Sequence, residues 1–93
     1  MRLIVAAPNI FSGDAVGNHC LGIARMATRL GIACQLHALI YDAANRHVKP
    51  MDALFSDIRP DDILLVIHSI FDPNFDRLLR LPIRKICYFH GIT

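Results

Sequence analysis

The chain has 93 residues, of which 54% are hydrophobic, and a formal net charge of +2. This length suits one small domain, and the high apolar fraction excludes an intrinsically disordered chain. A net charge this small excludes a strong electrostatic attraction to nucleic acid or to an anionic membrane.

The cysteines and the start of the chain both bear on the compartment in which the protein acts. Cys20, Cys34 and Cys87 are odd in number, widely spaced and not arranged as C-x-x-C. A disulfide framework or a thiolate zinc site is therefore not expected, and a reducing cytoplasmic setting is. The first apolar run is too short for a signal-peptide core or a membrane span, so it is interpreted as a first strand.

The first predicted unit is a strand followed by a loop and a helix. Residues 3–7 are continuously apolar, which is typical of a strand buried on both faces of a parallel sheet, and Pro8 is expected to end it. An apolar stripe at helical spacing follows over residues 16–30. Gly31 is expected to end this helix, because glycine readily adopts the left-handed backbone that follows a last helical turn.

The rest of the chain continues the alternation of strands and helices. The expected elements are strands over residues 34–41, 63–67 and 85–89 and short helices over residues 51–58 and 72–81, with residues 42–50 irregular. This order predicts an α/β fold, a Rossmann-like parallel sheet of about four strands with helices on both faces.

A loop with two glycines joins the first strand to the first helix. Its sequence over residues 12–19 is Ser-Gly-Asp-Ala-Val-Gly-Asn-His. Such a loop presents backbone N–H groups at the positive end of a helix, where a phosphate or another anion binds. The loop matches neither G-x-x-x-x-G-K-[ST] nor G-x-G-x-x-G, which disfavours a nucleoside triphosphatase and a standard NAD enzyme. The alternative is that Gly13 and Gly17 serve only the turn and the close packing of the helix on the sheet.

Three histidines are expected at the same edge of the sheet as this loop. His19 lies in the first turn of the first helix, and His68 and His90 each follow a predicted strand. In a parallel sheet all three would lie near the carboxyl edge, where ligands bind. Histidine can donate to sugar hydroxyls or phosphate and can move protons near neutral pH. A histidine-bound metal ranks below this interpretation, because no H-x-x-x-H spacing supports it.

Three segments together resemble a known family. They are the opening strand with residues 12–19 and the helix that ends in Arg-Leu-Gly, residues 61–69 (Asp-Asp-Ile-Leu-Leu-Val-Ile-His-Ser), and residues 84–93 (Arg-Lys-Ile-Cys-Tyr-Phe-His-Gly-Ile-Thr). In this order they are similar to the N-terminal domain of GT-B fold glycosyltransferases, in particular the retaining enzymes of glycosyltransferase family 4 (group 1). The likeness spans nearly the whole chain and rests on the joint pattern rather than on one motif.

The resemblance implies a function. The full enzyme would be a glycosyltransferase that moves a sugar, with retention, from a nucleotide-sugar donor to a glycan or lipid-linked acceptor in polysaccharide biosynthesis. It would act in the cytoplasm, and the resemblance allows a peripheral contact with the inner face of the membrane. No cofactor beyond the nucleotide-sugar substrate is expected, and no metal. The implied site residues are His68 as the catalytic residue that contacts the donor sugar, and Gly13, Asp14, Gly17, Asn18, His19 and His90 for donor or acceptor binding.

The resemblance also implies that residues 1–93 are part of a larger enzyme. They correspond to a partial, acceptor-side N-terminal domain, and the C-terminal domain that binds the donor is expected outside this sequence. The part alone is then expected to be inactive, because catalysis needs donor and acceptor held together across two domains. The loop has Gly-Asp-Ala-Val-Gly in place of the family's commoner paired glycines. The alternative is a stand-alone Rossmann-like module that binds a nucleotide or another anion without catalysis.

Two further expectations concern macromolecular partners. The last predicted strand, residues 85–89, is apolar like a central strand, yet no predicted strand follows it. An exposed apolar edge pairs readily with another chain, so the fragment is expected to self-associate. No nucleic-acid partner is expected, because the basic residues between positions 77 and 85 lack the interleaved aromatic residues of a nucleic-acid platform.

Overall fold

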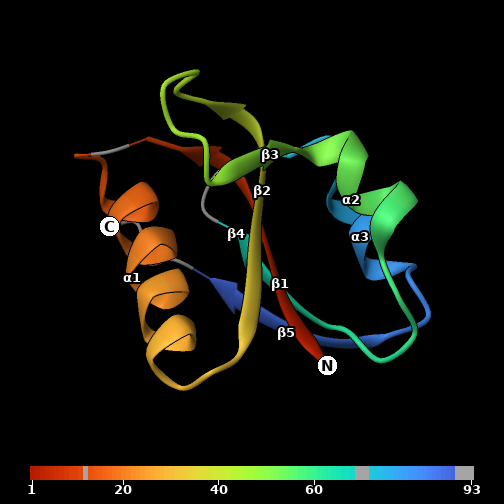
Figure 1. Ribbon diagram of the computed structural model, residues 1–93. Coiled ribbons are helices and arrows are strands. Elements are labelled where there is room, and N and C mark those ends of the chain that lie inside the picture. The colour runs from red at the N-terminus through yellow and green to blue at the C-terminus, as the bar shows by residue number, and fades with distance from the viewer. Residues whose placement is uncertain (12, 69–71, 90–93) are drawn as a thin grey trace.

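The protein is an α/β sandwich built on one parallel sheet. The computed structural model describes residues 1–11, 13–68 and 72–89. Its elements in chain order are β1 (Arg2–Ile10), α1 (Ala15–Arg29), β2 (Ala33–Tyr41), β3 (Val48–Pro50), α2 (Met51–Asp57), β4 (Ile63–His68), α3 (Phe75–Leu79) and β5 (Arg84–Phe89). All strand pairs are parallel, in the order β3-β2-β1-β4-β5 (Figure 1). This Rossmann-like layout confirms the predicted fold class.

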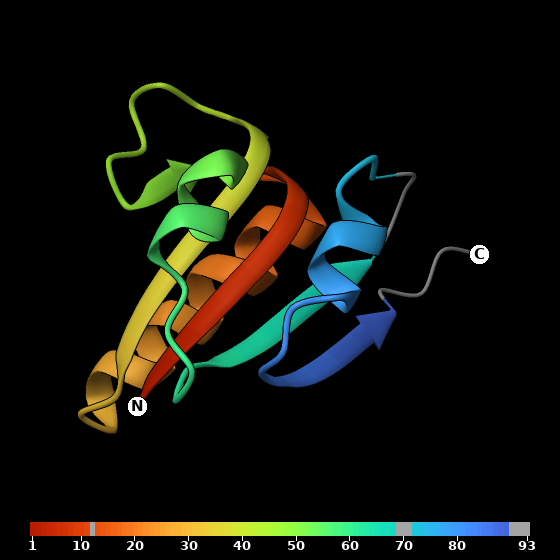
Figure 2. The ribbon, with the colours of Figure 1, turned by 90° about the vertical axis from the view of Figure 1, so that its right-hand side faces the viewer.

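Helices cover both faces of the sheet. α1 lies on one face, and α2 and α3 lie on the other (Figure 2). The buried core is divided accordingly, because successive residues of a strand point to opposite faces. Val5 and Ile67 belong to the cluster against α1, whereas Ile4, Val66 and Leu78 belong to the cluster against α2 and α3. The strands must therefore be apolar on both sides, which explains their continuous apolar runs.

The sheet has five strands where about four were expected, because residues 42–50, which were expected to be irregular, contain the short edge strand β3. It pairs with β2 from Leu36↔Val48 to Ala38↔Pro50. Val48 alone among the three β3 residues is buried, so no apolar run marks the strand in the sequence. Pro50 is tolerated there because an edge strand needs backbone N–H donors on one side only.

The first strand continues through Pro8, which was expected to end it. β1 pairs with β2 at Ala7↔Ala38 and again at Asn9↔Ile40, and the register passes over the proline. Pairing with β4 ends at Ala6↔Val66. Beyond Ala6 the strand is therefore bonded on one side only, and the N–H group that proline lacks is not needed for a second ladder.

Gly31 ends α1 as predicted. It has a φ of 74°, in the left-handed region that favours glycine. Its N–H donates to the carbonyl of Thr28 at 3.1 Å, and the N–H of Ile32 donates to Ala27 at 2.8 Å. This pair of bonds is the Schellman arrangement, which satisfies the last carbonyls of a helix and turns the chain into β2. No helix in the described part of the chain is long and apolar enough to cross a membrane.

An ion-pair cluster closes the amino edge of the sheet. The guanidinium of Arg2 donates to the carboxylate of Asp62 at 2.7 and 3.0 Å and to Asp57 at 3.0 Å. The Asp62 side chain is fully buried, and the hydrogen bond from Arg2 lowers its pKa below the usual value of an aspartate. The cluster joins the start of β1 to the start of β4, at the edge of the sheet opposite the glycine loop.

Candidate functional site

The carboxyl ends of β1 and β4 form the point at which the sheet reverses its winding. β1 and β4 are neighbours, and the chain leaves β1 toward α1 on one face and β4 toward α3 on the other. In open α/β sheets this divergence opens a crevice in which ligands bind. The candidate site is therefore built from the loop before α1, the end of β4 and the start of α3.

The turn before α1 is held together by Asn18. Gly13 has a φ of 86°, and its N–H donates to the side-chain oxygen of Asn18 at 3.1 Å. The Asp14 N–H donates to the carbonyl of Phe11 at 3.3 Å. These two amides are thus engaged within the turn, so Gly13 and Asn18 shape the loop.

Gly17 lets the first turn of α1 lie directly against the preceding backbone. A Cβ at this position would come within 1.9 Å of the Phe11 carbonyl oxygen and 2.6 Å of its nitrogen. Backbone atoms cannot move aside for a methyl group as a flexible side chain can. The alternative from the sequence, that the glycines serve the turn and the packing, therefore accounts for Gly13 and Gly17. This alternative does not decide whether the N-terminus of α1, which the two glycines position, binds a ligand.

The N-terminus of α1 is left without an acidic cap. Asp14 occupies the N-cap position with extended backbone, yet its side chain makes no capping hydrogen bond, and the first turn contains no acidic residue. The partial positive charge of the first turn is therefore uncompensated within the described residues. Ala15 is exposed and Val16 half-buried, whereas Gly17 is buried. Ala15 and Val16 are therefore the residues of this turn that are open to a bound anion.

His19 and His68 both lie at the carboxyl edge, as predicted, but on opposite faces of the sheet. His19, on α1, meets the ring of Tyr88 edge-on with the ring centroids 5.0 Å apart. His68 meets the ring of Phe89, with centroids 5.6 Å apart. Tyr88 and Phe89 are successive residues of β5 and therefore face opposite sides. The two histidines thus flank the tip of one strand and do not converge on one atom. His90 lies outside the described residues.

His68 opens into a small hollow beside α3. Its ring lies 4.5 Å from that of Phe75, and its buried Nδ1 atom has no hydrogen-bond partner among the described residues. The hollow has a volume of about 220 Å³ and is completed by Asp72, Pro73 and Asp76. An unpartnered buried nitrogen costs free energy, so this atom is suited to bond a ligand hydroxyl.

Asp72 and Phe75 were missed by sequence reasoning, which treated residues 72–81 only as a helix. Asp72 is buried, and its carboxylate accepts the N–H of Asn74 at 2.9 Å, which fixes the turn before α3. The signal that could have found these residues is the Asp-Pro-Asn-Phe sequence a few positions after the end of β4. An Asp-Pro turn at the carboxyl end of a parallel strand lies at the usual place of a ligand site.

Comparisons with known proteins assign no family to this chain. No protein-family model, curated protein or solved structure matches the chain. Within residues 1–11, 13–68 and 72–89, no three His, Cys or Asp side chains are grouped so that they could hold a metal ion. The function is therefore argued from the residues of the carboxyl edge.

Proposed function

We propose that this chain is the acceptor-side, N-terminal part of a retaining glycosyltransferase, in which the start of α1 binds the donor phosphates and His68 contacts the sugar. One observation carries the proposal. The open N-terminus of α1 and the hollow at His68 follow adjacent strands, β1 and β4, at the winding reversal. A ligand that lies across the carboxyl ends of these two adjacent strands can extend over both faces of the sheet and reach both features.

The α1 terminus supplies the chemistry for a phosphate. The amides of Ala15 and Val16 can donate to phosphate oxygens, and the helix dipole favours the negative charge. Asp14 opposes an anion by its charge, but its exposed carboxylate is free to point into solvent. The donor diphosphate would therefore lie over the first turn of α1 rather than within the Gly13 turn.

The hollow at His68 supplies the chemistry for a sugar. The carboxylates of Asp72 and Asp76 accept hydrogen bonds from hydroxyl groups, and the Phe75 ring offers an apolar face for a pyranose ring. The Nδ1 atom of His68 can bond one further hydroxyl. An aromatic face with several hydroxyl acceptors favours a carbohydrate over a purely apolar ligand.

The phosphate part of the proposal can be tested on the chain itself. Backbone amide NMR shifts are followed while uridine diphosphate is added, with uridine as the matched control without phosphates. We expect uridine diphosphate, and not uridine, to shift the amides of Ala15 and Val16. Equal shifts with both compounds, or shifts confined to other residues, would contradict phosphate binding at α1. Binding at about micromolar Kd by the chain alone would favour the stand-alone anion-binding module, whereas about millimolar binding fits half of a two-domain site.

The catalytic part needs the chain joined to a donor-binding domain. A reading frame that continues past residue 93 by at least one domain of about 100–200 residues would provide that protein. There we expect His68→Ala to lower kcat by about 100-fold, by loss of a contact made to the reacting sugar. His68→Gln should retain part of this activity. Arg80→Gln, an exposed change just past α3, is the matched control. Full turnover by His68→Ala would exclude the assignment.

A further inference from the structure

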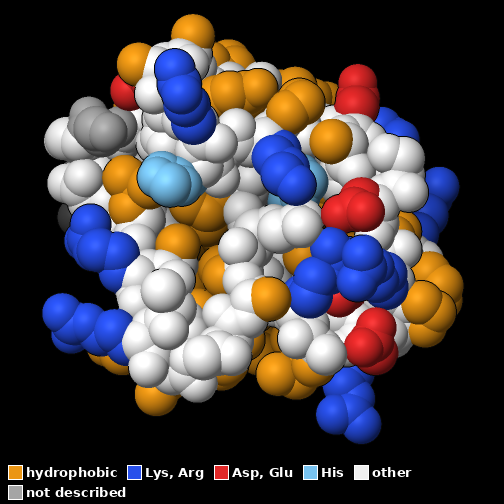
Figure 3. Space-filling view, viewed as in Figure 1, with side chains coloured by type: hydrophobic (Ala, Val, Ile, Leu, Met, Phe, Trp, Pro, Cys, Tyr) orange, Lys and Arg blue, Asp and Glu red, His pale blue; other side chains and the backbone are white. Residues whose placement is uncertain are grey.

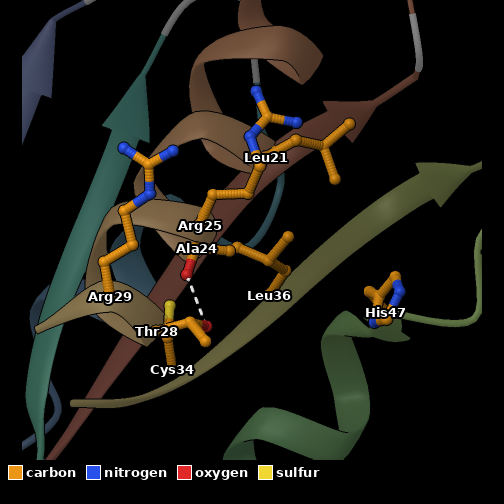
Figure 4. A pocket seen from close by; sticks show the side chains of 8 residues that line it. All are labelled: Leu21, Ala24, Arg25, Thr28, Arg29, Cys34, Leu36 and His47. Atoms are coloured by element: carbon orange, nitrogen blue, oxygen red, sulfur yellow. Dashed lines mark hydrogen bonds between the residues drawn. The ribbon is translucent and has the colours of Figure 1, made fainter. Parts of the chain in front are cut away.

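A second and larger hollow lies along the C-terminal half of α1. It has a volume of about 500 Å³, within the range of small-ligand sites, about 300–1,000 Å³. Leu21 and Leu36 form its floor between α1 and β2, and His47 faces the helix from across the hollow (Figure 4). The floor is apolar and the margin carries blue Lys or Arg side chains and a His side chain in the space-filling view (Figure 3).

The charge around this hollow is cationic and uncompensated. Arg25 and Arg29 lie one turn apart on α1, and both line the hollow. Neither guanidinium forms an ion pair within the described residues, whereas Arg2 and Arg77 each do. No carboxylate is among the lining residues. Cations are favoured in the last turn of a helix, which accounts for Arg29. This preference does not account for a second arginine, Arg25, beside the same apolar hollow.

We propose that this hollow binds a single-chain anionic amphiphile, with its alkyl chain on the Leu21 and Leu36 floor and its carboxylate or phosphate head against Arg25 and Arg29. A guanidinium binds such heads through two parallel hydrogen bonds, and two guanidiniums one turn apart can share one head. The apolar floor provides the affinity that surface charge alone lacks in salt.

The charge pattern favours this ligand over the other possible occupants. A purely apolar ligand would form no ion pair with Arg25 and Arg29, and free phosphate would make no contact with the apolar floor. The hollow lies at the opposite end of α1 from the Gly13 turn, so this proposal does not rest on the glycosyltransferase assignment. The two proposals are tested separately. Uridine diphosphate is the probe for anion binding at Ala15, and decanoate, an anionic amphiphile with one alkyl chain, is the probe for this hollow.

The thiol of Cys34 is a built-in reporter of occupancy. It is half-buried and lines the hollow, whereas Cys87 is exposed on β5. Burial raises the pKa of the half-buried Cys34 thiol above its usual value and that of the fully buried Cys20 thiol to about 12, so Cys20 is the less reactive of the two toward alkylation. The rates of alkylation by iodoacetamide at Cys34 and Cys87 are measured by mass spectrometry with and without decanoate, at about pH 8.5. Amide NMR shifts of residues 21–29 and 34–36 provide a second measurement.

We expect saturating decanoate to slow alkylation of Cys34 by about tenfold and to leave Cys87 unchanged. The double variant Arg25→Gln, Arg29→Gln should need about tenfold more decanoate for the same protection. The matched control Arg59→Gln, Arg80→Gln removes the same charge from exposed positions outside the hollow and should behave as wild type. Inorganic phosphate and the neutral decyl glucoside should not protect Cys34 at the same concentrations.

Several results would overturn the proposal. They are equal slowing at both cysteines, equal protection by decyl glucoside, and unchanged decanoate affinity in Arg25→Gln, Arg29→Gln. Protection of Cys34 that rises with protein concentration in the absence of decanoate would instead identify a second copy of the chain as the occupant.

Discussion

The imidazole of His19 meets the ring of Tyr88 edge-on, with the ring centroids 5.0 Å apart and the ring planes at 65°. This contact joins the start of α1 to the end of the edge strand β5, although α1 packs mainly on β1 and β2. It braces the helix end that is proposed to receive phosphate. It also adds to β5 a contact on the α1 face, beyond the ladder with β4.

Tyr88→Ala tests this brace. We expect the free energy of unfolding to fall by about 1 kcal/mol, the typical value of an aromatic pair. Amide hydrogen exchange in the first turn of α1 should become faster, because the helix end loses this ring contact with β5. Tyr88→Phe keeps the edge-on ring and is the control. Unchanged exchange in Tyr88→Ala would show that the contact does not hold α1.

Substitutions of two glycines of α1 should have opposite effects. Gly17→Ala should destabilise the fold by about 1–3 kcal/mol or more, because the new Cβ would overlap the backbone of Phe11. Gly22→Ala meets only the end of the Arg25 side chain, at 4.0 Å, and should stabilise the helix by up to about 1 kcal/mol. Urea unfolding of both variants measures the difference. A Gly17→Ala protein as stable as wild type would mean that the loop can retreat from the helix.

The Arg2–Asp62 pair should make stability depend on acid. Asp62→Asn is expected to cost about 1–3 kcal/mol at neutral pH, since it weakens a buried, charge-assisted hydrogen bond. Asp61→Asn, whose exposed carboxylate meets the terminal ammonium at 3.3 Å, should cost less than about 1 kcal/mol.

The sign of the pH dependence follows from the lowered pKa of Asp62, whose main cause is the hydrogen bond from Arg2. The contribution is complete above the unfolded aspartate pKa, about 3.9, and is lost as the pH falls through the lower folded value. The gap in unfolding free energy between wild type and Asp62→Asn should therefore narrow in acid. A gap that stays constant from pH 7 down to about pH 2 would contradict this linkage.

The exposed edge of the sheet should cause self-association. Ile86 on β5 is 57% exposed and Phe89 is 66% exposed. An apolar edge strand with free backbone groups is a template for another strand. At about tens of micromolar we expect wild type to sediment as a dimer or a larger species and Ile86→Lys to be monomeric. Met26→Lys adds the same charge at an exposed helix position and should not change association. A clean wild-type monomer would exclude edge pairing.

Local sequence patterns were sufficient to predict strands that are covered by helices on both faces of the sheet. The apolar runs of β2 and β4 predicted both strands to within one residue at each end, because a strand between two helical layers must be apolar throughout. Gly31 marked the end of α1 for a purely local reason, its left-handed backbone. The edge strand β3 escaped prediction because only Val48 of its three residues is buried. The prediction that Pro8 ends the first strand was wrong, because the effect of a proline depends on whether its missing N–H group is needed for pairing with a neighbouring strand.

The amino-acid sequence by itself determined the alternation of strands and helices, the parallel sheet and the arrival of His19 and His68 at one edge. These follow from periodicity and from the rule that parallel strands align their carboxyl ends. Only the tertiary structure decided that the two histidines lie on opposite faces, against Tyr88 and Phe89. His68 points away from α1 because the residue before it, Ile67, points into the cluster against α1. The register of β5 against β4, in which Ile67 pairs with Tyr88 and His68 with Phe89, decides which aromatic ring each histidine meets, so a slip of one residue would exchange the two rings between the faces. Register is set by packing between distant segments, and no local pattern contains it.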